Sequence, residues 1–111
     1  VANDLASVSP KMAETQDFFA STIAEELSKI EKEVSPETKI LIEDAMQRMK
    51  ALETEYESLK DDLAESGDDN RVIYAMISNF QNRIDLLQNT LQQINTIKQI
   101  KNLNNETSTT I

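Results

Sequence analysis

The chain contains one glycine, Gly67, and it lies between two long segments in which apolar residues recur at alternating steps of three and four. Seven apolar positions precede it: Ile42, Ala45, Met49, Leu52, Tyr56, Leu59 and Leu63. Seven more follow it: Ile73, Ile77, Phe80, Ile84, Leu87, Leu91 and Ile94. Steps of three and four bring side chains to one face of an α-helix, so the pattern predicts two long amphipathic helices, each with a heptad seam.

The two seams match each other when the second segment is folded back on the first. Leu63 then pairs with Ile73 and Ile42 with Ile94, and in each of the seven pairs the residue numbers add to 136. A constant sum is what an antiparallel pair requires, and it centres the turn on Asp68, directly after the glycine. The seams therefore predict an antiparallel helical hairpin.

The residues at this turn have the chemistry that the end of one helix and the start of the next require. Gly67 can take the left-handed backbone conformation that closes a helix. The residues that can cap the following helix and place a polar or negative group at its positive end are Asp68, Asp69 and Asn70. We therefore expect the arms of the hairpin to cover about 36–66 and 69–101.

Two Ser-Pro pairs mark helix starts. Ser9 fits the N-cap position and Pro10 the first helical position, and Ser35 with Pro36 repeats the signal. Because the residue before a proline disfavours the helical conformation, the second pair also ends the helix that the first begins. We therefore predict a first helix over about 10–33. Its apolar stripe consists of Met12, Phe19, Ile23, Leu27, Ile30 and Val34.

One edge of the hairpin is the more apolar, and it predicts where the first helix packs. Heptad positions on this edge place Glu55 opposite Arg83 and predict an ion pair between them. The apolar residues of the edge are Leu41, Ala51, Met76, Leu86, Ile97 and Ile100. We expect the first helix to lie in this groove and to cover the open end of the hairpin, so that the tip at Gly67 stays bare. The predicted fold is all-α and resembles a three-helix bundle.

A chain of 111 residues is long enough for one domain with a modest core. The sequence divides into an irregular leader over residues 1–8, a single helical domain over 9–101 and a polar stretch over 102–111. Because the last stretch loses the apolar periodicity, we expect it to form a flexible tail.

Charge and residue inventory exclude several classes of function. The formal net charge of −9 repels nucleic-acid phosphates and anionic membrane surfaces. The chain has no histidine, no cysteine and no glycine-rich loop, and so it lacks the groups that most often act as general bases, nucleophiles and phosphate cradles. We therefore expect no enzymatic activity, no cofactor and no dedicated metal site.

Two features remain as candidate partner surfaces. The first is an acidic tip made of Asp61, Asp62, Glu65, Asp68 and Asp69. Carboxylates bind calcium, but EF-hand spacing is absent, so helix caps and a solvated end are favoured over a weak cation site or an acidic docking tip. The second is Phe18, because adjacent residues of a helix point in different directions and Phe18 and Phe19 cannot both face the core. An exposed Phe18 indicates a partner surface.

Three segments of the chain resemble a known family. They are Ser-Pro-Glu-Thr at 35–38, Leu-Glu-Thr-Glu-Tyr-Glu-Ser-Leu-Lys-Asp-Asp-Leu at 52–63, and Arg-Val-Ile-Tyr-Ala-Met-Ile-Ser-Asn-Phe-Gln-Asn-Arg-Ile-Asp-Leu-Leu-Gln at 71–88. Together they are similar to the C-terminal region of bacterial membrane-anchored anti-sigma factors, which lie beside extracytoplasmic-function sigma factors. The resemblance implies a helical periplasmic region that follows a cytoplasmic segment and one membrane helix.

The resemblance also implies a role. The sigma-binding segment would lie before Val1, and this chain would receive a periplasmic signal or hold a protein partner and pass the signal to the membrane helix. We therefore expect a non-enzymatic sensing or protein-interaction domain, periplasmic and anchored to the inner membrane only through an upstream helix. The alternative is a structural or dimerising coiled coil, in which a second copy of the chain fills the apolar edge of the hairpin.

Overall fold

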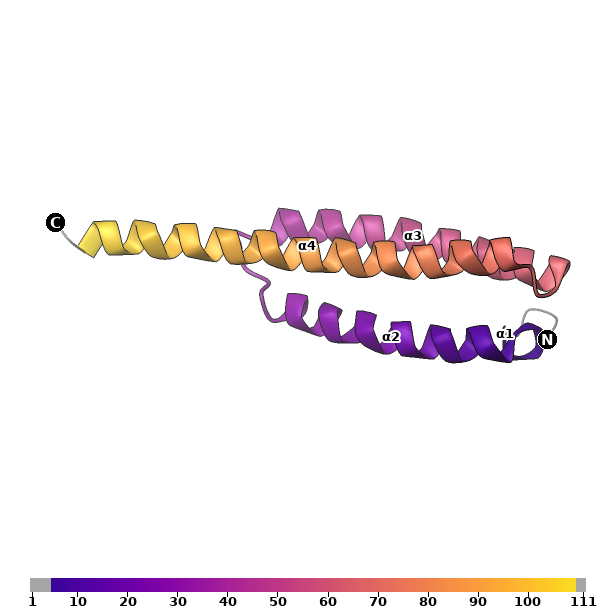
Figure 1. Ribbon diagram of the computed structural model, residues 1–111. Helices are drawn as coiled ribbons and strands as arrows, with labels where there is room; N and C mark the ends of the chain where they lie inside the picture. Colours follow the sequence, from indigo (N-terminus) through magenta and orange to yellow (C-terminus); the bar gives the residue numbers. More distant parts are fainter. Residues whose placement is uncertain (1–4, 110–111) are drawn as a thin grey trace.

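The computed structural model describes residues 5–109, and these residues form four α-helices (Figure 1). They are α1 (Leu5–Val8), α2 (Pro10–Glu31), α3 (Lys39–Ser66) and α4 (Asn70–Thr109). α3 and α4 form the predicted antiparallel hairpin, α2 packs along α4, and the single turn α1 contacts α2 and α3. The bundle is elongated, with extents of 68 × 22 × 20 Å. The predicted all-α, three-helix architecture is confirmed.

An aliphatic and aromatic core runs along the bundle where the three long helices meet. Its most buried side chains are Met12, Ile23 and Ile30 of α2, Met49, Tyr56 and Leu63 of α3, and Met76, Phe80, Leu87 and Ile94 of α4. Phe80 lies at the centre of this core. Its ring stacks on that of Phe19 with centroids 5.1 Å apart, and it lies 4.6 Å from the ring of Tyr56. One side chain of α4 therefore joins α2 to α3.

The start of α2 has the predicted chemistry. Ser9 is the N-cap, its hydroxyl accepts a hydrogen bond of 3.2 Å from the backbone N–H of Met12, and Pro10 occupies the first turn. We predicted an irregular leader over residues 1–8, but Leu5–Val8 form a helical turn and Leu5 is buried. Burial of the leucine side chain accounts for the order of this turn. Residues 1–4 of the predicted leader lie outside the described residues.

The start of α3 lies later than predicted. Ser35 and Pro36 do not begin the helix, because Ser35 to Thr38 form a turn in which the Thr38 N–H donates to the Ser35 carbonyl at 3.1 Å. The buried Thr38 hydroxyl accepts from the Ser35 N–H at 2.9 Å and donates to the Glu33 carbonyl at 2.7 Å. The turn satisfies backbone groups that a helix starting at Pro36 would use, so α3 begins at Lys39.

The hairpin turn is centred as predicted, and its glycine is more constrained than predicted. Gly67 ends α3 with a φ of 75° and a ψ of −152°. The φ is positive, but the ψ lies outside the left-handed helical region that we expected, in a region that only glycine populates readily. Of the three possible caps, Asp69 is the one used, since its Oδ1 accepts a hydrogen bond of 2.9 Å from the Arg71 N–H.

α4 continues beyond the predicted end. It is helical to Thr109, so residues 102–109 do not form the expected flexible tail, while 110–111 lie outside the described residues. The polar run contains neither glycine nor proline, so nothing in it interrupts the helix. Two ion pairs of 3.1 Å, Lys98 with Glu33 and Lys101 with Glu37, tie the helix to the α2–α3 connection.

α2 does not occupy the predicted position along the hairpin. We expected it to cover only the open end, but α1 and the start of α2 lie beside the α3–α4 turn (Figure 1). Ser9, Lys11 and Met12 border a groove whose other side includes Asp68 and Asn70. The 22 residues of α2 together with α1 are long enough to run beside most of α3, so the far end of α4 is the one that projects.

The predicted apolar edge is not where α2 packs. Along that edge α3 and α4 face each other without α2, around a groove lined by Leu41, Asp44, Ala45, Arg48, Leu86, Asn89, Thr90 and Gln93. Ala51 and Ile100 of the same edge are exposed. α2 lies on the other side, where Phe19 stacks on Phe80 and Ile73 with Ile77 borders Met12. Contact of Phe19 and Met12 with apolar side chains of α4 stabilises α2 in this position.

α4 is turned about its axis relative to the predicted seam. Ile73 and Ile77, expected opposite α3, border α2, whereas Asn79 faces α3 and donates from Nδ2 to the Leu52 carbonyl at 2.8 Å. The predicted ion pair of Arg83 with Glu55 is also wrong. The Arg83 guanidinium lies 5.2 Å from the Phe80 ring centroid and 5.8 Å from that of Tyr56, while Glu55 is exposed. Because α4 packs on two helices, its buried surface is wider than a two-helix seam.

Candidate interaction surface

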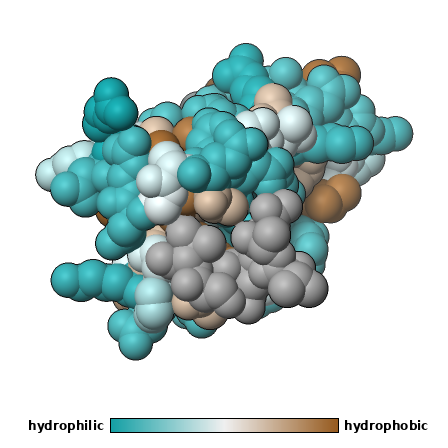
Figure 2. All heavy atoms as spheres, turned by 90° about the vertical axis from the view of Figure 1, so that its right-hand side faces the viewer, coloured by the Kyte–Doolittle hydropathy of each residue, from teal (hydrophilic) through white to brown (hydrophobic). Residues whose placement is uncertain are grey.

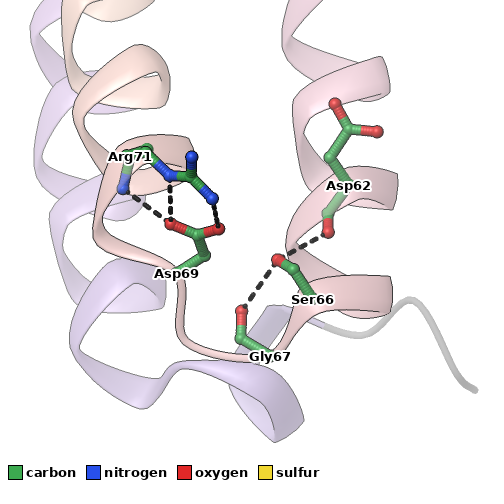
Figure 3. Close-up of polar contacts among 5 residues, drawn as sticks. All are labelled: Asp62, Ser66, Gly67, Asp69 and Arg71. Atoms are coloured by element: carbon green, nitrogen blue, oxygen red, sulfur yellow. Dashed lines mark hydrogen bonds and ion pairs between the residues drawn. The ribbon is translucent and has the colours of Figure 1, made fainter.

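The structure brings the five predicted acidic residues to the turn between α3 and α4. Asp61, Asp62, Glu65 and Asp68 are exposed, and Asp69 is half-buried. The backbone carbonyl of Asp62 accepts a hydrogen bond of 2.9 Å from the Ser66 hydroxyl, and the Asp62 carboxylate points away from the turn (Figure 3). The exposed carboxylates are therefore solvated charges at the end of the bundle.

Asp69 has a structural role at this turn. Besides capping α4, its carboxylate pairs with the Arg71 guanidinium, with 3.3 Å between Oδ2 and Nη2 (Figure 3). The hydrogen bond from the Arg71 side chain is the largest cause that lowers the pKa of Asp69, and the bond from the Arg71 backbone N–H acts in the same direction. The carboxylate is held ionised at the positive end of α4, as an N-cap requires. Within residues 5–109, no three acidic side chains at the turn or elsewhere gather closely enough to hold a metal ion.

Phe18 lies apart from the acidic turn. Its side chain is 68% exposed, and its ring packs edge-on against the half-buried Phe19 with centroids 5.5 Å apart. α2 runs parallel to α4, and Phe19 lies level with Phe80, which is ten residues, or about 15 Å, beyond Asn70. The structure therefore does not join Phe18 and the acidic residues into one site.

Phe18 belongs to a different surface, which we call the outer face. It begins next to the turn, where Asp68 borders it, as a groove of about 390 Å³ between α2 and α4 whose walls also include Lys11, Ile73 and Ile77. A second hollow of about 320 Å³ shares Ile73 and Ile77 and is bordered by Tyr74, which is 73% exposed. Ile73 and Ile77 line both hollows together with polar residues such as Asn70.

Heptad spacing extends the outer face along both helices. On α4 the half-buried residues at seven-residue steps are Ile77, Ile84 and Leu91, and the exposed residues beside them are Tyr74, Gln81, Gln88 and Asn95. On α2 the exposed residues at the same spacing are Lys11, Phe18 and Glu25. Residues seven apart share a helix face, so these side chains form one strip.

The outer face is poor in charge along α4. This helix carries six charged residues in 40, Arg71, Arg83, Asp85, Lys98, Lys101 and Glu106, whereas α3 carries twelve in 28. Between Asn70 and Asn95 the strip positions named above are apolar or uncharged polar, and the exposed Asp85, eleven residues after Tyr74, is the one acidic residue beside them. Depletion of charge together with exposed aromatic rings distinguishes the centre of protein interfaces from other surface. The strip therefore has the composition of a docking surface.

Sequence reasoning missed most of the outer face because it assigned Ile73, Ile77, Ile84 and Leu91 to the hairpin seam. Tyr74 received no role. The amide-rich and charge-poor composition of 70–95 was a signal that could have identified it, since the exposed surface of α3 is rich in acidic residues.

A second groove, of about 230 Å³, lies on the inner side where α2 meets α3. It is bordered by Gln16, Glu53, Tyr56 and Arg83. The Tyr56 hydroxyl donates a hydrogen bond of 2.6 Å to the Gln16 side-chain oxygen, and burial raises the pKa of the phenol. Tyr56 therefore stays protonated and acts as a donor that links α3 to α2.

The surface at the turn end of the bundle is largely hydrophilic, with apolar side chains emerging at separate places along its margin (Figure 2). The outer face runs along the side of the bundle from this end. No helix within residues 5–109 combines the length and the hydropathy needed to cross a membrane.

No protein-family model matches the chain, and the searches of curated proteins and of solved structures return no match.

Proposed function

We propose that the chain is a non-enzymatic protein-interaction domain that binds its partner through the outer face of α2 and α4. The observation that carries the proposal is the uncharged strip of α4 from Asn70 to Asn95, which runs beside the exposed rings of Phe18 and Tyr74. In a chain with a net charge of −9, a solvated helix face would carry acidic residues, as α3 does. An uncharged strip with apolar hollows is better suited to a protein than to water.

The cellular role that we propose is that of the periplasmic sensing region of a membrane-anchored anti-sigma regulator. The similarity of segments 35–38, 52–63 and 71–88 to that family supports this role, and the elongated helical bundle is compatible with it. In this role, binding at the outer face would change the position of the bundle relative to the membrane helix that precedes it. The sigma factor itself would be held elsewhere in the regulator.

The proposal is tested in the bacterium that produces the protein, with the regulator present at full length. Fractionation should place the protein in the inner membrane, with this domain accessible to protease from the periplasm. Phe18→Ser and Tyr74→Ser should change transcription from promoters of the neighbouring sigma factor, because they remove apolar contacts of the outer face. Asp61→Ser, on the acidic turn, is the matched control and should leave transcription unchanged.

Two results would contradict the role. One is a cytoplasmic location of the domain. The other is an unchanged promoter output in both Phe18→Ser and Tyr74→Ser at normal protein levels, since a regulator whose docking surface is lost cannot transmit its signal. A change produced by Asp61→Ser alone would move the partner surface to the acidic turn.

A further inference from the structure

The outer face has a charge pattern that distinguishes a second copy of the chain from other partners. Lys11 and Glu25 lie seven residues before and after Phe18, and all three side chains are exposed on one face of α2. If a second copy packs antiparallel with Phe18 on the twofold axis, Lys11 of each copy lies opposite Glu25 of the other. Such a self-complementary surface is what a twofold interface requires.

The neighbouring residues of α2 are compatible with the same arrangement. Glu14 lies four residues before Phe18 and Thr22 four residues after it, so an antiparallel copy places a carboxylate opposite a hydroxyl and not opposite another acid. The Thr22 hydroxyl donates its proton to the Phe18 carbonyl at 3.3 Å and carries no charge. No pair of like charges results at these positions.

α4 contributes an uncharged surface to the same interface. Two copies that each carry a net charge of −9 repel one another wherever acidic faces meet. The strip of α4 from Asn70 to Asn95 limits this repulsion, because Asp85 is the one acidic residue beside it, and it presents Tyr74, Ile77 and Ile84 to a facing helix. The acid-rich face of α3, with a formal charge of −4 over Lys39–Ser66, lies on another side of the bundle.

The outer face is also large enough. The strip from Asn70 to Asn95 spans 25 residue steps, or about 37 Å along the helix, and α2 and α4 together are about 20 Å wide. Their product is roughly 750 Å² per copy, close to the roughly 800 Å² that each partner buries in a stable interface of standard size.

We propose that the chain forms an antiparallel twofold dimer through the outer face, with Phe18 at the axis and reciprocal pairs between Lys11 and Glu25. This rests on the proposed function in one respect, that the outer face binds protein, and it identifies the partner as a second copy. The interface differs from a coiled coil that uses the apolar edge of the hairpin, because α2 here contributes half of the contact.

Sedimentation equilibrium of the purified chain tests the dimer. The unsubstituted chain should dimerise in the micromolar range, as interfaces of this size can. Lys11→Glu should weaken dimerisation about tenfold, because it places two acids opposite each other, and the double variant Lys11→Glu with Glu25→Lys should restore it. Lys50→Glu, an exposed lysine of α3, changes the net charge by the same amount and should have little effect.

The absence of cysteine from the sequence allows an independent measurement. Because position 14 of one copy lies opposite position 22 of the other, the double variant Glu14→Cys with Thr22→Cys should form intermolecular disulfides much faster than Thr22→Cys alone or than Glu43→Cys on α3. A monomer at all concentrations, or equal effects of Lys11→Glu and Lys50→Glu, would overturn the proposal. A monomer whose promoter output still responds to Phe18→Ser would leave the proposed function standing with another protein as the partner. A dimer without that response would reject the regulatory role instead.

Discussion

The two arms of the hairpin come from similar apolar patterns, yet they use their surfaces differently. α3 follows a heptad seam, with Ile42, Met49, Tyr56 and Leu63 buried, and its remaining surface is acidic. α4 buries one face against α3 and a second against α2, and the face between α2 and solvent carries a single acidic residue, Asp85, from Asn70 to Asn95. The two helices have similar apolar periodicity but differ in surface charge. Surface charge therefore distinguishes a solvated face from a candidate docking face where periodicity does not.

The largest expected effect is at Phe80, where α4 contacts both partners. Phe80→Ala should lower the free energy of unfolding by about 3–5 kcal/mol, because it removes a buried ring that packs on Phe19 and Tyr56. Tyr74→Ala, on the exposed side of the same helix, should change the free energy of unfolding of the monomer by less than about 0.5 kcal/mol. Urea denaturation at low protein concentration measures both. Similar losses for the two variants would mean that α4 has no such division into faces.

The next effect separates the buried and half-buried positions of α3. Met49 is 3% exposed, so Met49→Ala should cost about 2–5 kcal/mol. Leu52 is half-buried, so Leu52→Ala should cost clearly less, about 1 kcal/mol. Thermal unfolding of the two variants gives the order. An equal or larger loss of stability in Leu52→Ala would mean that Leu52 is as buried as Met49, as the predicted seam requires.

The connection between the arms depends on one backbone conformation. Gly67→Val should destabilise the fold by about 1–3 kcal/mol, since φ is 75° and ψ is −152° at this residue. The space around the residue is open, so backbone strain and not a clash is the cause. Gly67→Ala provides a smaller side chain with the same strain, and chemical denaturation should find it destabilising too. A neutral Gly67→Ala would show that the turn adopts another conformation.

The smallest effect concerns the link from α3 to α2. Tyr56→Phe removes the hydroxyl that donates to Gln16 and should cost about 1 kcal/mol near neutral pH. Burial raises the pKa of Tyr56 above its ordinary value of about 10, so the folded state favours the neutral phenol. The stability that the raised pKa of Tyr56 contributes is complete below about pH 10 and is lost as the pH rises above that value.

The pH dependence provides the check. Between pH 8 and pH 11, the unsubstituted protein should lose more stability than Tyr56→Phe, as followed by circular dichroism during thermal unfolding. Parallel curves for the two proteins would show that the phenol ionises as readily in the folded state as in the unfolded one.

Much of the fold follows from local chemistry. The Ser9 cap, the Asp69 cap and the positive φ of Gly67 depend on the residues at those positions, so their sequence signals are sufficient. The heptad seam of α3 could also be predicted, because α3 packs mainly on one helix, α4. The start of α3 was misplaced because the Thr38 hydroxyl bonds Ser35 and Glu33, and nothing in the local Ser-Pro signal shows that turn.

The surface of α4 could not be predicted in the same way. Residues such as Ile73 and Ile77 satisfy both the spacing of a hairpin seam and that of a contact with α2, so periodicity alone does not decide between them. The side on which α2 packs depends on long-range contacts such as Phe19 with Phe80. Of the candidate residues, the sequence identified Phe18 but not Tyr74. The interpretation that it favoured for the acidic turn, helix caps and a solvated end, agrees with the Asp69 cap and the exposed carboxylates.

We propose that two copies of the protein bind each other through the outer face of α2 and α4. Nuclear magnetic resonance of the ¹⁵N-labelled chain, compared at low and high protein concentration, tests it most directly. We expect concentration-dependent shifts or broadening at the amides around Lys11, Phe18, Tyr74 and Ile84, with the acidic face of α3 unchanged. Changes confined to the acidic face of α3 or to the projecting end of α4, or an unchanged spectrum, would contradict this dimer.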